Sequence, residues 1–166
     1  ATATTIVNGN EQSLTEKYIS TNSDESAILV ENGGNATISN AVIDKSSGNS
    51  TNTENSEFYG VNAGILVKSN STATIKNATI STNAKGSNAV FSTGTDSKIY
   101  ISDSTITTEG ESSSRGLDAT YGGYIEADNV KFQLKEDLVL LLLRIEVKAQ
   151  LLQKILILKQ MEQDLQ

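Results

Sequence analysis

The sequence predicts an all-β fold: a right-handed parallel β-helix of about four rungs, followed by a Leu-rich C-terminal helical tail. Three observations favour this fold. Apolar residues recur at intervals in the twenties, which is typical of a solenoid. Short stretches alternate β-branched and polar residues, as strands with one buried face do. Gly and Asn separate these stretches and accept the backbone conformations that turns require. Low hydrophobicity with abundant Ser, Asn and Thr is also typical of disorder, but disordered chains need not space their apolar residues.

The repeat is clearest when four segments are aligned on one Ile: "NATISNAVID", "TATIKNATIST", "KIYISDSTITT" and "GYIEADNVKF". The aligned anchors are Ile38, Ile75, Ile101 and Ile125, at steps of 37, 26 and 24 residues. Five residues after each anchor comes a second apolar residue, and these are Ile43, Ile80, Ile106 and Val130. Rungs of a β-helix stack about 4.8 Å apart, so like residues lie above like. We therefore expect the anchors to form one inner column, and Ile65, Phe91 and Leu117 to form a second.

The remaining elements of the repeat domain follow in chain order. Residues 4–20, "TTIVNGNEQSLTEKYIS", predict a less regular N-terminal turn. Residues 44–60, "DKSSGNSTNTENSEFYG", account for the longer first step as a loop that interrupts one rung without breaking the stack. The residues before the anchors are expected to face outward, and these are Thr37, Thr74, Tyr100 and Tyr124. Asn40, Asn77 and Asp103 follow the anchors at a corner, where stacked Asn side chains can hydrogen-bond along a ladder.

The amino-acid composition changes near residue 133. This change divides the chain into a repeat domain, 1–133, and a Leu-rich tail, 134–166. The tail holds eleven Leu, whereas the preceding 133 residues hold four. Its apolar spacing predicts an amphipathic helix from about residue 137, which could cap the last rung. A second interpretation is that the tail is an out-of-frame continuation of the repeats. Shifting the reading frame forces Ser, Gly, Asn or Asp at several positions, such as Asn or Asp across Lys154–Ile155.

Composition excludes several classes of function. The chain has no Cys and no His, which removes disulfides, thiolate or His-ligated metal sites and His-dependent nucleophilic catalysis. The net charge of −7 is unfavourable for binding nucleic acid or anionic lipid. No apolar run reaches the roughly 18–20 residues of a membrane helix, so we expect no membrane insertion. The sequence predicts no particular oligomeric state.

At this point the chain resembles right-handed parallel β-helix proteins of the pectin-lyase-like class, and most of all the Ser/Thr/Asn-rich repeat regions of bacterial adhesin-like surface proteins. The likeness is carried by "SAILVENGGNATISNAVI", "FYGVNAGILVKSNSTATIKNATIST" and "SRGLDATYGGYIEADNV", within residues 26–133. The resemblance implies an extracellular or cell-surface location and contact with glycans or a host surface. It also implies where catalysis would be found, because enzymes of this class that cleave acidic polysaccharides have clustered Asp ligands for calcium and a nearby Arg base.

The sequence matches that catalytic pattern poorly. Arg115 is the one Arg of the front part and is interpreted as forming a salt bridge with Asp118 at a rung corner. The carboxylates of Asp44, Asp103 and Asp128 fall in different predicted columns, so we expect them not to converge. We therefore predict that the chain is not an enzyme. No cofactor is expected, with calcium left open at the acidic loops around Asp24–Glu25 and Glu54–Glu57.

Carbohydrate binding is the function the residues favour. Four tyrosines are candidate platforms because the apolar face of a sugar packs on an aromatic ring, and these are Tyr59, Tyr100, Tyr121 and Tyr124. Some of these rings could instead cover seams between rungs. The leading hypothesis is a non-catalytic extracellular repeat module for surface adhesion or carbohydrate binding. The alternatives are a polysaccharide lyase-like relative with weak or no activity and a passive structural stalk.

Overall fold

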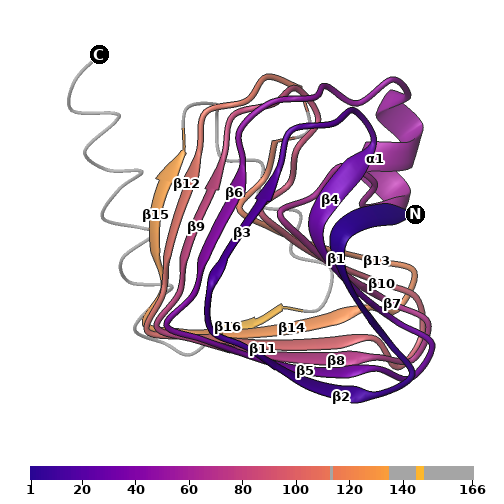
Figure 1. Cartoon of the computed structure of the whole chain (residues 1–166), viewed down its shortest axis with the longest axis vertical. Helices are drawn as coiled ribbons and strands as arrows, with labels where there is room; N and C mark the ends of the chain where they lie inside the picture. Colours follow the sequence, from indigo (N-terminus) through magenta and orange to yellow (C-terminus); the bar gives the residue numbers. More distant parts are fainter. Residues whose placement is uncertain (113, 135–144, 148–166) are drawn as a thin grey trace.

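The computed structural model describes residues 1–112, 114–134 and 145–147, and these form a parallel β-solenoid of about five turns. Three sheets run the length of the stack (Figure 1), and each turn contributes one strand to each sheet. All the strand pairs are parallel. The sheets are called A, B and C in the order in which the chain reaches them, and from sheet C the chain returns to sheet A. The predicted β-helix is therefore confirmed.

The strands have the following bounds. Sheet A contains β1 (Thr2–Asn8), β4 (Glu25–Glu31), β7 (Ile65–Lys68), β10 (Val90–Thr93) and β13 (Leu117–Thr120). Sheet B contains β2 (Glu11–Leu14), β5 (Asn35–Ser39), β8 (Thr72–Lys76), β11 (Lys98–Ser102), β14 (Tyr124–Asp128) and β16 (Ile145–Val147). Sheet C contains β3 (Lys17–Ser20), β6 (Val42–Lys45), β9 (Thr79–Thr82), β12 (Thr105–Thr108) and β15 (Lys131–Leu134).

The N-terminal segment is a regular turn, so the structure has one turn more than the four we expected. Strands β1, β2 and β3 pair in register with β4, β5 and β6. Leu14 lies beneath Ile38 and is buried, and Tyr18 packs against the core beneath Ile43. The segment looked irregular in the sequence because Tyr18 and polar residues occupy inner positions that Ile and Ala fill in later turns.

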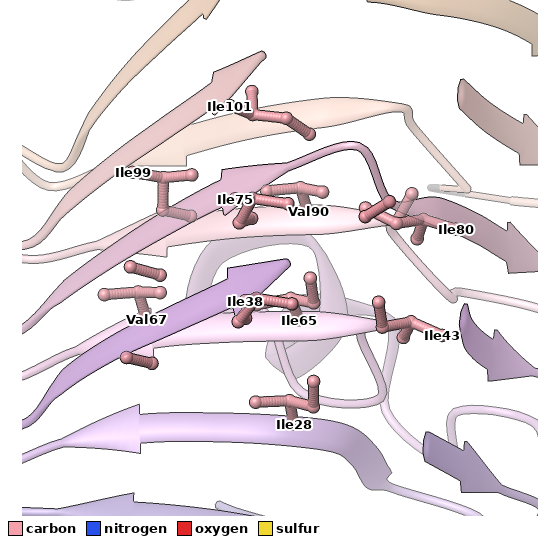
Figure 2. Close-up of a cluster of buried hydrophobic side chains, with 14 of the residues drawn as sticks. Ile28, Ile38, Ile43, Ile65, Val67, Ile75, Ile80, Val90, Ile99 and Ile101 are labelled. Atoms are coloured by element: carbon pink, nitrogen blue, oxygen red, sulfur yellow. The ribbon is translucent and has the colours of Figure 1, made fainter. Parts of the chain in front are cut away.

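The inner core is a set of stacked aliphatic columns, seen in Figure 2 as Ile side chains from successive turns. Ile38, Ile75 and Ile101 lie in direct register, as expected. The expectation for Ile125 is wrong: it pairs with Ile99, and Ala127 continues the anchor column. Similarly, Phe132 and not Val130 stands above Ile106. Both offsets are of two residues, which leave a side chain on the same face of a strand. Ile125 and Val130 are accordingly still buried.

The error for Phe91 is one residue, and it places this side chain on the opposite face of sheet A. Val90 pairs with Ile65 and Leu117 in the inner column. Phe91 instead joins an outer cluster with Leu29, Ala63 and Leu66. Helix α1 (Thr53–Tyr59), which lies in the predicted loop 44–60, covers this outer face of sheet A (Figure 1). In strands β4, β7, β10 and β13, sheet A is therefore largely buried on both faces, whereas sheets B and C expose their outer residues.

The predicted Asn ladder is present at the corner between sheets B and C. Asn40, Asn77, Asp103 and Asn129 all have positive φ angles, between 49° and 55°. The amide of Asn77 donates to Asn40 Oδ1 at 2.6 Å, and the amide of Asn129 donates to Asp103 Oδ1 at 2.7 Å. The ladder joins neighbouring turns through side chains where no strand pairing does so.

Most of the predicted helical tail lies outside the described residues. Of residues 134–166, the structure describes Leu134, which ends β15, and Ile145–Val147, which pair with β14 as strand β16. At these three residues the expectation of helix is wrong, because they continue sheet B. Within the described part of the chain, no helix is long and apolar enough to span a membrane.

Candidate functional site

The four candidate tyrosines come together as two pairs. Tyr59, at the end of α1, stacks on Tyr121, in the turn after β13, with ring centroids 5.5 Å apart and planes 22° apart. The two side chains are 52% and 60% exposed. Hydrogen bonding with the side chain of Tyr59 is the main cause that raises the pKa of Tyr121. These exposed rings come from segments far apart in the sequence.

The second pair lies on the outer face of sheet B. Tyr100 on β11 and Tyr124 on β14 have ring centroids 6.0 Å apart, with planes at 59°. They are diagonal neighbours, because Tyr124 pairs with Lys98 and Tyr100 pairs with Glu126. Tyr124 is thus two residues out of register with Tyr100, just as Ile125 is with Ile101. The rings still face outward side by side, because the shift is even.

Helix α1 is fixed to sheet A by its C-terminal end. The hydroxyl of Thr120 donates to the carbonyl oxygen of Phe58 at 2.7 Å, and the hydroxyl of Thr93 reaches the same oxygen at 3.5 Å. Gly60 ends the helix with φ of 66°. A Cβ atom at Gly60 would lie 2.5 Å from the ring of Phe91. Only Gly lets the backbone turn left-handed this close to the outer cluster. These contacts hold Tyr59 next to Tyr121.

Arg115 forms ion pairs with residues of helix α1 and of strand β13 in sheet A. Its guanidinium donates to Glu57 Oε1 at 2.8 Å and to Asp118 Oδ2 at 3.0 Å. The predicted pair with Asp118 is therefore present, and Glu57 on α1 was missed. Burial opposes the charge on Arg115, but the two carboxylates outweigh it and raise its pKa. Burial raises the pKa of Asp118, with Arg115 acting in the opposite direction.

Of the two acidic segments that left calcium open, Glu54–Glu57 lies in helix α1, and the carboxylates of Asp24–Glu25 accept hydrogen bonds from protein groups. Asp24 accepts hydrogen bonds from the backbone N–H and hydroxyl of Thr51. Burial raises its pKa, but the hydrogen bonds from Thr51 and Ser50 and the charge of Lys45 together outweigh burial, and the net pKa is lowered. Glu25 accepts from Ser20 and Asn22. Among the described residues, no group of three or more acidic side chains is placed to hold a metal ion.

Lys45 is a fully buried cation that the sequence did not single out. Its ammonium donates to the carbonyl oxygens of Asn22, at 2.6 Å, and Ser47, at 2.5 Å. Burial lowers its pKa to about 8, although the charges of Glu25 and Asp24 act in the opposite direction. Lys45 therefore ties the start of the insertion to the loop before β4.

We expect the stability of the protein to rise as pH increases from about 8 towards 10.5, relative to a Lys45→Met variant. In this window the unfolded chain still binds the Lys45 proton while the folded chain has released it, so stability rises with pH. Urea unfolding of both proteins at several pH values across the window measures this difference. Lys76→Met, at an exposed position, controls for the loss of one lysine. Parallel pH profiles for wild type and Lys45→Met would contradict the lowered pKa.

The three carboxylates considered for catalysis lie in different places. Asp44 is on β6 of sheet C and Asp128 is on β14 of sheet B. Asp103 lies at the corner between these sheets, where its carboxylate accepts a hydrogen bond from Asn129. Comparison of the chain with protein-family models, with curated proteins and with solved structures finds no match. The fold therefore defines a class, the parallel β-solenoids, and the function has to be inferred from the surface.

Proposed function

We propose that the chain is a non-catalytic extracellular repeat module that binds carbohydrate through its paired tyrosines. One observation carries the proposal: four exposed or partly exposed tyrosines lie as two pairs on a stacked scaffold. Tyrosine gives a large contact area with few rotatable bonds, and a scaffold that fixes the rings in advance lowers the entropic cost of binding. Sugars suit such surfaces because they have an apolar face and hydroxyl groups at the rim.

Packing in the hydrophobic core does not account for the positions of Tyr59 and Tyr121. Tyr59 and Tyr121 are more than half exposed, and the adjacent Phe58 is 44% exposed. The outer cluster on sheet A consists of Leu29, Ala63, Leu66 and Phe91, with Ala3 packed against it, and does not include these rings. A passive stalk would not require exposed aromatic side chains at this corner, so this grouping favours binding over spacing alone.

The test is binding to immobilised neutral polysaccharides, with xylan and mannan as probes. A variant with all four tyrosines replaced by Ala should lose at least about thirtyfold in affinity, from the summed loss of ring contacts. Far-UV circular dichroism should show that the solenoid is retained. Ile19→Ala with Val42→Ala is the matched control, because it removes exposed apolar side chains from sheet C.

Two results would contradict the proposal in different ways. Equal binding by the four-tyrosine variant and the wild type would remove the tyrosines as the site. Calcium-dependent release of reducing ends from pectin, xylan or mannan would favour the lyase-like alternative over a non-catalytic module. The pectin-lyase-like and adhesin-like relationships remain part of this proposal, as does the location at the bacterial cell surface.

A further inference from the structure

We propose that the two tyrosine pairs form one continuous surface that binds an extended chain of a neutral polysaccharide. This inference rests on the carbohydrate-binding function proposed above and narrows its ligand to a class. It depends on three features of the described residues: the short connection between the pairs, the backbone conformation of Tyr121, and the charges beside the rings.

The pairs are joined by a single tight turn. Only Gly122 and Gly123 separate Tyr121 from Tyr124, and the N–H of Gly123 donates to the carbonyl oxygen of Thr120 at 2.9 Å. Three residues span at most about 10 Å, so the pairs lie close together on either side of one corner. Each tyrosine of this turn meets a partner from another element, Tyr59 from α1 and Tyr100 from β11. A chain crossing the corner can therefore contact both pairs.

The turn holds its shape closely. A Cβ atom at Gly123 would lie 2.3 Å from the carbonyl oxygen of Ser92, so this position requires Gly. Gly122 has a φ of 89°. Two adjacent glycines in a turn are often mobile, but here the second is fixed against the neighbouring rung. The relative position of the two pairs is thus set by the fold.

Tyr121 occupies a position that does not suit a large side chain. Its φ is 50°, in the left-handed region. By strand register the equivalent positions in the preceding turns are Gly94, Ser69 and Asn32. Small residues and Asn adopt this conformation readily, whereas a tyrosine is an outlier there. Tyr121 is 60% exposed and stacks on Tyr59, which is itself 52% exposed, so it is not packed into the core clusters. Strain of this kind is concentrated at functional sites.

The charges favour a neutral ligand over an acidic one. The hydroxyl of Tyr124 donates to Glu126 Oε2 at 3.3 Å, and Glu126 is also the register partner of Tyr100. Glu54 is close enough to Tyr121 to act on it electrostatically. Lys98 is the cation that the register places beside Tyr124. The chain as a whole carries −7, so uronate-rich polymers would be repelled while sugar hydroxyls can donate to the carboxylates.

The experiment is titration calorimetry of the full chain with xylo- and manno-oligosaccharides from dimer to hexamer, with polygalacturonate as the acidic probe. In at least one neutral series, the hexamer should bind at least about tenfold more tightly than the dimer, because it reaches both pairs. Tyr59→Ala/Tyr121→Ala and Tyr100→Ala/Tyr124→Ala should each reduce hexamer affinity to that of the dimer. Tyr121→Asn should weaken hexamer binding while leaving the melting temperature unchanged or higher, which a structural role for Tyr121 would not produce.

The outcomes separate this inference from the function on which it rests. Dimer and hexamer binding with equal affinity, or tighter binding of polygalacturonate, would overturn the continuous neutral surface while leaving carbohydrate binding intact. A hexamer affinity that depends on one pair alone would do the same. Failure of every neutral oligosaccharide and of polymeric xylan and mannan to bind would instead remove the proposed function.

Discussion

Replacing Phe91 by Ala is expected to lower the free energy of unfolding by about 3–5 kcal/mol, the usual cost of deleting a buried aromatic ring. Phe91 is completely buried in the outer cluster with Leu29 and Leu66, and the backbone of Gly60 lies directly against its ring. The cavity cannot collapse easily, because sheet pairing fixes one side and the end of α1 fixes the other. Urea unfolding monitored by circular dichroism measures the loss. Hydrogen exchange should show that α1 loses protection first, since it is held by this contact.

The control lies in the same column of the same sheet. Strand register places Ile6, Leu29, Leu66 and Phe91 in one column. Ile6, at the N-terminal end of this column, is 46% exposed. Ile6→Ala should therefore cost only about 1 kcal/mol, because much of its surface is already in water. If Phe91→Ala lowered the free energy of unfolding no more than Ile6→Ala does, this would contradict the packing of α1 against the outer face of sheet A.

Replacing Arg115 by Ala is expected to destabilise the protein by about 3–5 kcal/mol, as removal of one partner from a buried ion pair does. The side chain of Asp118 is 1% exposed and would lose its cation. Its other oxygen, Oδ1, already has no hydrogen-bond partner among the described residues. Glu57→Gln should cost about 0–1 kcal/mol, because Glu57 is about a third exposed and its charge can be solvated. Chemical denaturation of the three proteins compares these effects.

A double-mutant cycle and a pH series test whether the unpaired carboxylate of Asp118 causes the loss of stability in Arg115→Ala. Arg115→Ala/Asp118→Asn should be about 1–3 kcal/mol more stable than Arg115→Ala, since no uncompensated charge remains. The pKa of Asp118 is raised by burial, and loss of Arg115 raises it further. Such a carboxyl destabilises the fold at pH values above its ordinary pKa of 3.8. The deficit of Arg115→Ala should therefore shrink as pH falls towards that value. A deficit independent of pH, unrelieved by Asp118→Asn, would mean that Arg115 acts through packing.

The sequence predicted which face of most strands is buried, because alternation with period two is local. Ile38, Ile75 and Ile101 lie in the expected column, and the Asn ladder forms at the expected corner. The same period cannot distinguish a register from one shifted by two residues, so Ile125 was placed inside the core but in the wrong column. Even shifts change the neighbours of a side chain without changing its face.

The error at Phe91 had a signal in the sequence. The strands of sheet A contain or overlap the sequences "AILV", "GILV" and "AVF", which are continuous apolar runs and not alternating ones. Strands buried on both faces have this pattern, so a cover on the outer face could have been predicted. What fills that role, helix α1, lies in a polar segment that resembles a loop.

The tyrosines illustrate the limit of local reasoning about the site. Their residue type marked Tyr59, Tyr100, Tyr121 and Tyr124 as candidates, and the outward face of Tyr100 and Tyr124 followed from alternation. The contact between Tyr59 and Tyr121 did not follow, because it depends on the path of the insertion over sheet A and on Arg115, Thr93 and Thr120 holding its end.

Local patterns of residues were enough to predict the solenoid, its buried faces and its turn residues, because side-chain alternation and positive-φ turns are properties of a few consecutive residues. The folded chain was needed to establish the register of the last rung, the covering of the outer face of sheet A by α1 and the contact between Tyr59 and Tyr121. These features depend on contacts between residues distant along the chain, where packing and buried charge select one arrangement among several that local patterns allow equally.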